Sequence, residues 1–201
     1  MTGLSVEIRT AAPDELPEAV AAVVAAFVTD PVARFACPSP YEYLRTMPLV
    51  VRVVGRASCE HGAAHVTPGF GGAALWLPPG VHPDGEALVR LWREAVPADR
   101  LDDLFGTLEK AGQSHPDEPH WYLPMIGVEP NAQGRGLGAA LLRFALDRCD
   151  REGVLAYLES SNPRNIPLYE RHGFEPMGRI EIGAAPLVTP MLRRPRRPRS
   201  A

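Results

Sequence analysis

Three glycines stand at alternate positions, Gly134, Gly136 and Gly138, between an apolar segment and an amphipathic one. Glycines at this spacing let the backbone approach a ligand closely, and they can turn several backbone N–H groups toward one point at the start of a helix. Such a group of donors at a helix N-terminus binds phosphate. The spacing therefore predicts a loop that holds a phosphate-bearing ligand.

Two widespread phosphate-binding loops fit this spacing poorly. The P-loop needs G-x-x-x-x-G-K-[ST], and neither its lysine nor its hydroxyl is present. The dinucleotide loop needs G-x-G-x-x-G, whereas the chain has G-x-G-x-G. Glu159 stands where a ribose-binding acid would, but the 48 residues after Gly153 are few for the strands that a dinucleotide fold would still need. A nucleotide-dependent oxidoreductase is the weakest of the hypotheses.

The elements that must position the loop follow from hydrophobic spacing and from the placement of Pro and Gly. Apolar residues four apart, from Leu137 to Cys149, predict a helix that begins near Gly136 and ends at Gly153. Strands are predicted over residues 4–10, 63–67, 71–77, 120–128, 154–160, 174–183 and 186–192. Further helices are predicted over 15–28, 40–60 with a break or kink near Pro48, 84–112 as two helices divided at Pro97, and 163–172. This order indicates a mixed α/β domain.

Residues 133–138 read QGRGLG, which resembles the Q/R-x-x-G-x-G/A motif of the GNAT superfamily of acyl-CoA-dependent N-acetyltransferases. Residues 127–130 (GVEP) resemble the strand end that precedes this motif in the family. Residues 162–174 resemble its N-x(6)-Y-E-x-x-G-F signature. The run from 121 to 174 further resembles the puromycin-type acetyltransferases of actinobacteria, which residues 34–118 match only loosely.

The resemblance implies a fold and a cosubstrate. The fold is an α/β domain with a mixed, mostly antiparallel central sheet, splayed central strands (120–128 and 154–160) and flanking helices. Residues 1–192 are expected to form this single domain, and 193–201 a disordered tail rich in Arg and Pro. The cosubstrate is acetyl-CoA, and the residues implied to bind it are Ile126, Val128, Gln133, Gly134, Arg135, Gly136, Leu137, Gly138, Ala139 and one of Asn162 and Asn165.

The implied reaction is direct transfer of the acetyl group to a primary amine of a small molecule, for instance a puromycin-like antibiotic or metabolite. It needs a base, a donor for the oxyanion and an acid for the leaving thiolate. The Val128 N–H is the expected oxyanion donor and Tyr169 the expected acid. Glu159 is either the base or a partner in a salt bridge, and Glu118 or His120 could act through water. The alternative hypothesis is a GNAT fold that binds acyl-CoA without catalysis.

Aromatic residues and cysteines leave other roles open. Three tryptophans and a tyrosine either line an acceptor pocket or belong to the core: Trp76, Trp92, Trp121 and Tyr122. Cys149 lies on the apolar face of its predicted helix, so we expect it in the core and expect no acyl-cysteine intermediate. The three cysteines and six histidines show no metal-ligand spacing, so no metal is expected.

Charge bounds the partners. The net charge of −3 conceals a basic end, because five arginines fall in residues 193–201 and leave residues 1–192 at −8. An acidic body argues against nucleic-acid binding. No apolar run is long enough to span a membrane, and unpaired cysteines are typical of a reducing compartment. We therefore expect a cytoplasmic monomer or homodimer with neither a membrane nor a nucleic acid as partner.

Overall fold

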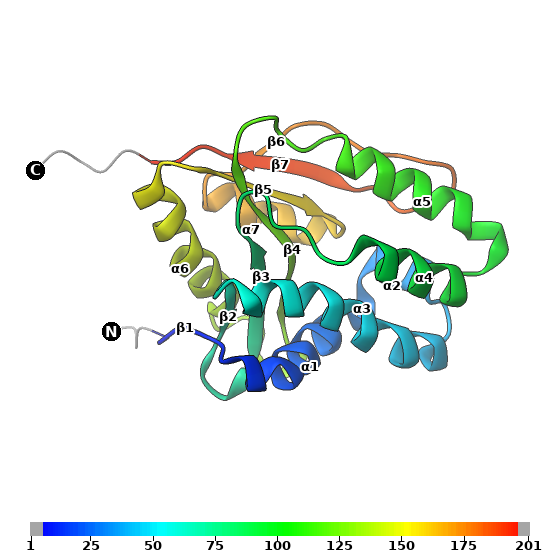
Figure 1. Cartoon of the computed structure of the whole chain (residues 1–201), viewed down its shortest axis with the longest axis horizontal. Coiled ribbons are helices and arrows are strands. Elements are labelled where there is room, and N and C mark those ends of the chain that lie inside the picture. The colour runs from blue at the N-terminus through cyan, green and yellow to red at the C-terminus, as the bar shows by residue number, and fades with distance from the viewer. Residues whose placement is uncertain (1–5, 197–201) are drawn as a thin grey trace, which may run out of the picture.

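The computed structural model describes residues 6–196, which form one seven-stranded sheet in the order β1-β2-β3-β4-β5-β7-β6. Every neighbouring pair is antiparallel except β4 and β5, which are parallel. The expected fold class, a mixed and mostly antiparallel sheet with flanking helices, is thereby confirmed (Figure 1). The strands are β1 Arg9–Thr10, β2 Ala64–Val66, β3 Gly72–Leu77, β4 His120–Val128, β5 Leu155–Ser160, β6 Glu175–Pro176 and β7 Thr189–Arg193.

Helices cover both faces of the sheet. They are α1 Leu16–Ala26, α2 Pro31–Ala36, α3 Pro40–Glu60, α4 Gly85–Ala95, α5 Ala98–Gly112, α6 Leu137–Glu152 and α7 Ile166–Arg171. One core cluster joins α1, α2 and α3 to β2 and β3, and Figure 1 shows α3 in front of β3. A second cluster joins α6 and α7 to the opposite side of β3, β4 and β5. Because side chains alternate along a strand, β3 and β4 each contribute residues to both clusters, whereas β5 contributes to the second alone.

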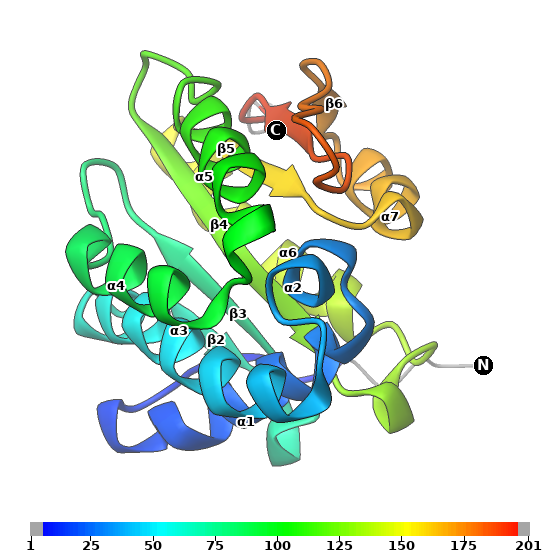
Figure 2. The ribbon, with the colours of Figure 1, turned by 90° about the vertical axis from the view of Figure 1, so that its right-hand side faces the viewer.

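The two central strands separate soon after they meet. β4 pairs with β5 only from His120–Leu155 to Tyr122–Tyr157, although β4 continues to Val128 and β5 to Ser160. Pro124 follows two residues after Tyr122, where the pairing of β4 with β3 also shifts register. Proline has no N–H to donate to a ladder, so in a central strand it is confined to such irregular places. The expected splay is therefore present, and Figure 2 shows β4 and β5 pointing apart.

Several expected elements differ in extent. The strand expected over 174–183 is only Glu175–Pro176, followed by an isolated bridge between Ile180 and Val188. The strand expected over 4–10 is only Arg9–Thr10, and its first two residues lie outside the described chain. A break or kink was expected near Pro48, and the helix does not break there, because α3 continues through Pro48. Tertiary packing of the buried face of α3 compensates for the backbone hydrogen bond that proline cannot make.

The tail was expected to begin at Arg193, but Arg193 belongs to the folded domain. Arg193 is the last residue of β7 and only 3% exposed, and its guanidinium forms two hydrogen bonds with Asp150 on α6, of 2.8 and 2.7 Å. Its Nε donates to the His172 carbonyl. Residues 197–201 of the expected tail lie outside the described part of the chain. Within the described part, no helix is long and apolar enough to cross a membrane.

Candidate active site

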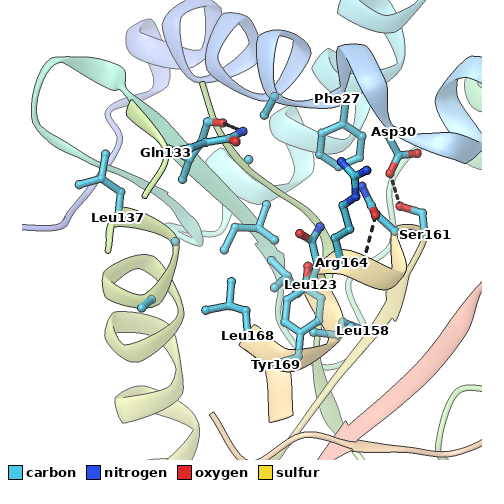
Figure 3. A pocket seen from close by; sticks show the side chains of 18 of the residues that line it. Phe27, Asp30, Leu123, Gln133, Leu137, Leu158, Ser161, Arg164, Leu168 and Tyr169 are labelled. Atoms are coloured by element: carbon cyan, nitrogen blue, oxygen red, sulfur yellow. Dashed lines mark hydrogen bonds between the residues drawn. The ribbon is translucent and has the colours of Figure 1, made fainter. Parts of the chain in front are cut away.

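A cavity of about 510 Å³ opens where β4 and β5 separate (Figure 3). Its walls come from the glycine loop and the start of α6, from both strand ends, from the turn between α1 and α2, and from α7. The residues expected to bind the cosubstrate line this cavity with the exception of one, and the expected base Glu159 and acid Tyr169 line it too: Ile126, Val128, Gln133, Gly134, Gly136, Leu137, Gly138, Ala139, Glu159, Asn162, Asn165 and Tyr169. The exception is Arg135, which lines a neighbouring hollow.

The glycine loop is shaped by two residues in the left-handed region. Gly134 has a φ of 74° and Gly136 a φ of 79°, and a Cβ placed on either would meet nothing within 4 Å. Gly136 is the N-cap of α6, a helix of 16 residues, so the free N–H groups of the first turn lie beside the cavity. Open space over a helix N-terminus suits an anionic group.

The edge of β4 offers unpaired backbone groups to the cavity. Glu129 N–H bonds to the Gly71 carbonyl, and Gly127 pairs with Ala73. Because an antiparallel strand alternates the direction of its backbone groups, Ile126 and Val128 direct theirs away from β3, toward the side that β5 has left. The Val128 carbonyl accepts a hydrogen bond of 3.0 Å from Gln133 Nε2, which ties the glycine loop to the strand.

Tyr169 lies on the floor of the cavity, near Leu123 and Leu158 in Figure 3. It is 6% exposed, and no hydrogen bond from its hydroxyl is found within residues 6–196. Burial first, and then the charge of Asp30, raise the pKa of this hydroxyl above its usual value. The phenol therefore keeps its proton throughout the physiological pH range, which is the state that a proton donor needs.

Glu159 lies between the cavity and a layer of aromatic rings. Its side chain is 9% exposed, and its Oε1 lies 3.1 Å from Nε2 of His115. Burial raises the pKa of Tyr122 and of Tyr157, and the adjacent Glu159 carboxylate adds to both shifts. Glu159 is thus a buried carboxylate with one edge toward the cavity. His120, an expected alternative base, contacts His115 instead of lining the cavity.

Sequence reasoning missed the turn between α1 and α2. Asp30 is 8% exposed, caps α2 through hydrogen bonds from Val32 N and Ala33 N, and accepts one from Ser161 Oγ. Asp30 and Ser161 both line the cavity. The available signal was Asp30 followed directly by Pro31, because Asp at the N-cap and Pro at the first helical position start helices.

Two further side chains border the cavity near this turn. Figure 3 shows Arg164 extending toward Phe27, which belongs to the short 3-10 turn Phe27–Thr29 after α1.

The two candidate asparagines differ in their contacts. Asn162 Oδ1 accepts a hydrogen bond from Arg164 N, whereas the Asn165 side chain makes no capping bond. The amide of Asn165 is therefore the less committed of the two.

The three tryptophans and Cys149 do not line the cavity. Trp76 is fully buried, Trp121 donates to Glu152, and Trp92 packs against the first core cluster. Cys149 is fully buried as expected, and burial raises the pKa of its thiol to about 12. Residues 6–196 contain no group of three or more His, Cys, Asp or Glu side chains arranged to hold a metal ion.

Comparison with known proteins places this geometry in a family. The model of the Acetyltransferase (GNAT) family matches residues 74–174, from β3 to the end of α7 and beyond. An uncharacterized N-acetyltransferase of Schizosaccharomyces pombe is 30% identical over 177 residues, 78% of this chain and 69% of that protein. A mycothiol acetyltransferase of Beutenbergia cavernae is 34% identical over 113 residues, 54% of this chain but only 30% of that protein.

Solved structures extend the likeness to nearly the whole chain. A Corynebacterium glutamicum protein, described as a histone acetyltransferase and related acetyltransferase, superposes with a TM-score of 0.70 at 25% identity, over 98% of this chain and all of that one. The Drosophila melanogaster polyamine N-acetyltransferase gives 0.66 at 16% identity, over 94% and 99%. The glycine loop, the splayed strands and the matched segment coincide, and the chain belongs to the GNAT family of N-acetyltransferases.

Proposed function

We propose that this enzyme transfers the acetyl group of acetyl-CoA directly to a primary amine of a small molecule. The observation that carries the proposal is that one cavity holds an open glycine loop at a helix N-terminus, the unpaired edge of β4, a buried carboxylate and a buried phenol. These are the groups that such a transfer requires.

The cavity fits the parts of acetyl-CoA in order. The pyrophosphate would rest on the N–H groups of residues 135–139, over the open space at Gly134 and Gly136. The pantetheine amides would pair with the backbone of Ile126 and with the second lone pair of the Val128 carbonyl, as an added strand does, which leaves the Val128 N–H for the oxyanion. Asn165 is the better candidate for a further amide contact, because its side chain is not used as a cap.

Three groups of this chain would carry the chemistry. Glu159 would take a proton from the acceptor ammonium and leave a nucleophilic amine. The Val128 N–H would stabilise the oxyanion that forms when the amine attacks the thioester carbonyl. Tyr169 would protonate the departing thiolate, and the raised pKa of its hydroxyl keeps that proton in place until then. The second proton of the attacking nitrogen, released as the amide forms, would return to Tyr169.

The acceptor side of the cavity combines apolar and charged walls. Phe27, Leu123 and Leu158 provide apolar surface, Glu159 provides negative charge, and Arg164 provides positive charge. An amine carried on a partly apolar body that also bears an acceptor or anionic group complements these walls. A puromycin-like antibiotic or metabolite is one such amine, and the resemblance of residues 121–174 to puromycin-type enzymes supports testing it first.

The deciding experiment measures free thiol release from acetyl-CoA with a panel of amines. The panel holds puromycin, an aminoacyl-nucleoside analogue, agmatine, a lysine-containing peptide and a peptide with a free N-terminus. A parallel thermal-shift series compares acetyl-CoA with NADH, because a ligand raises the melting temperature only when it binds the folded state. A shift with NADH alone, or none with acetyl-CoA, contradicts the proposal. A shift with acetyl-CoA without turnover of any amine favours the non-catalytic alternative.

A further inference from the structure

Glu159 is the inner end of a row of polar contacts that leads away from the cavity. His115, in the loop after α5, lies 3.1 Å from Glu159 through Nε2 and 2.9 Å from His120 Nε2 through Nδ1. His120, the first residue of β4, lies 2.8 Å from the Glu118 carbonyl through Nδ1. The exposure increases along the row, because the Glu159 side chain is 9% exposed and that of His115 25%.

The three contacts of this row share too few protons for all of them to be hydrogen bonds. Each of its three contacts needs one proton to be a hydrogen bond, and neither the Glu118 carbonyl nor an ionised Glu159 has one to give. Two neutral imidazole rings supply only two. One contact is therefore left without a proton until a third arrives from outside.

The geometry indicates which contact that is. His120 Nδ1 must donate to the Glu118 carbonyl, since a carbonyl cannot donate. His120 Nε2 then accepts, so His115 Nδ1 donates to it and His115 Nε2 carries a lone pair toward Glu159. This last contact is the longest of the three. Glu159 Oε1 lies 3.1 Å from His115 Nε2, within ion-pair distance. This buried oxygen nevertheless has no hydrogen bond of acceptable geometry.

We propose that Glu159, His115 and His120 form one proton-accepting chain, in which the proton that Glu159 removes from the acceptor ammonium fills the contact with His115 and leaves through His120. The proposal rests on the proposed function and assigns positioning and relay roles to two residues outside the cavity. The proton balance is simple. The ammonium loses one proton, the row goes from two to three, and release from His120 Nδ1 to water restores two. Both rings then return from the Nε2–H to the Nδ1–H form before the next turnover.

Other groups around the chain do not supply that proton. The titratable side chains that face it within residues 6–196 are Tyr122 on β4, Tyr157 on β5 and His82 from the loop before α4. Both phenols have a raised pKa, so they do not give up their protons near neutral pH. Burial lowers the pKa of His120, which favours its neutral form at rest.

The first test compares the pH dependence of kcat/KM in wild type, His115→Gln and His120→Gln, with His61→Gln as control. His61 is an exposed histidine that bonds to the Ala57 carbonyl at the end of α3 and takes no part in the row. The glutamine of His115→Gln cannot relay a proton, but its amide can donate to the Glu159 carboxylate. We therefore expect at least a tenfold loss of kcat/KM and an acid limb displaced to lower pH. A loss with an unmoved acid limb means that His115 only supports the fold, and it overturns the proposal.

The second test measures the protonation of the two histidines without substrates. Its wild-type measurement remains possible if a variant fails to fold. Imidazole ¹⁵N chemical shifts of wild type should show both rings protonated at Nδ1 above the titration. In Glu159→Gln, the pH at which His115 takes up its proton should fall. If His115 takes up its proton at the same pH in wild type and in Glu159→Gln, the proposed proton relay is wrong, even if the enzyme acetylates amines. The expected shifts without turnover of any amine contradict the proposed function and the relay's part in it.

Discussion

Ser161 donates a hydrogen bond of 2.6 Å to Asp30 across 131 residues of sequence. Asp30 stands at the start of α2, and Ser161 follows the end of β5. The same carboxylate accepts two backbone hydrogen bonds that cap α2. One buried side chain thus sets the position of the α1–α2 turn relative to the strand that carries Glu159.

Replacing Ser161 with alanine should loosen this wall. The change leaves an oxygen of a buried carboxylate without its donor, and such a loss costs roughly 1–3 kcal/mol. Urea denaturation should show that decrease in the free energy of unfolding, together with a higher KM for the acceptor. Ser114→Ala is the matched control, because it removes an exposed bond to the Lys110 carbonyl. Equal losses in the two variants would contradict the role given to Ser161.

Tyr169→Phe should separate chemistry from binding. The change removes one hydroxyl from a residue that is 6% exposed and makes no hydrogen bond within the described chain, so the fold loses little. We expect kcat to fall by about 10²–10⁴, as for loss of a general acid, while acetyl-CoA still raises the melting temperature. Tyr41→Phe, at a tyrosine that is 75% exposed, is the control. A full rate in Tyr169→Phe would remove this residue from the mechanism.

Gly136→Ala should weaken acetyl-CoA binding beyond its effect on stability. Its φ of 79° costs a side chain about 1–2 kcal/mol, and the new methyl group would occupy the space open to the ligand. Gly153 is the matched control, with a φ of 68°, equally open space and a place at the far end of α6. Both variants should lose similar stability, but only Gly136→Ala should raise the KM for acetyl-CoA. A similar rise in KM for Gly153→Ala would exclude a local effect on the ligand.

Asp150→Asn should weaken the attachment of the end of β7 to α6 in a pH-dependent way. Burial opposes ionisation of Asp150, but hydrogen bonds from Arg193 and Arg196 outweigh it and hold its pKa below the usual value. We expect a loss of about 2 kcal/mol at pH 7, less than for a fully buried pair because Asp150 is 23% exposed. A depressed pKa contributes stability above the unfolded value of about 3.9, and that contribution disappears as pH falls through the folded value.

Denaturation of wild type and Asp150→Asn at pH 7 and again near pH 3.5 checks this sign. The difference between the two proteins should shrink at the lower pH. Asp147→Asn, a change on the same helix at a residue that makes no ion pair within residues 6–196, should leave the stability nearly unchanged. A difference that stays constant with pH would show that the carboxylate charge is not what holds Arg193.

The local features of the site could be predicted because each depends on a few neighbouring residues. The bounds of β4 coincide with the predicted strand 120–128, and Gly153 ends α6 in the left-handed conformation that its residue type favours. The glycine loop could be located because positive φ angles and a helix start leave a trace in residue type.

The remaining features depend on contacts between distant segments. Ser161 meets Asp30, and His115 meets Glu159, only after the sheet has brought α2 and the loop after α5 to β5. No periodicity of a single segment encodes such a meeting. The place of Arg193 was missed for the same reason, since its arginine-rich context is typical of a solvated end, and only its partner Asp150 identifies it as part of the sheet.

The proline in the middle of β4 has a consequence for the speed of ligand entry. Because Pro124 cannot extend the ladder and β5 has already left, no interstrand hydrogen bond has to break before acetyl-CoA enters between the strands. We expect association to follow a single second-order phase whose rate rises linearly with ligand concentration, as for orientation-limited encounters without a prior opening step. The division of the sheet is thereby completed during folding, so each catalytic cycle begins with the cleft already formed.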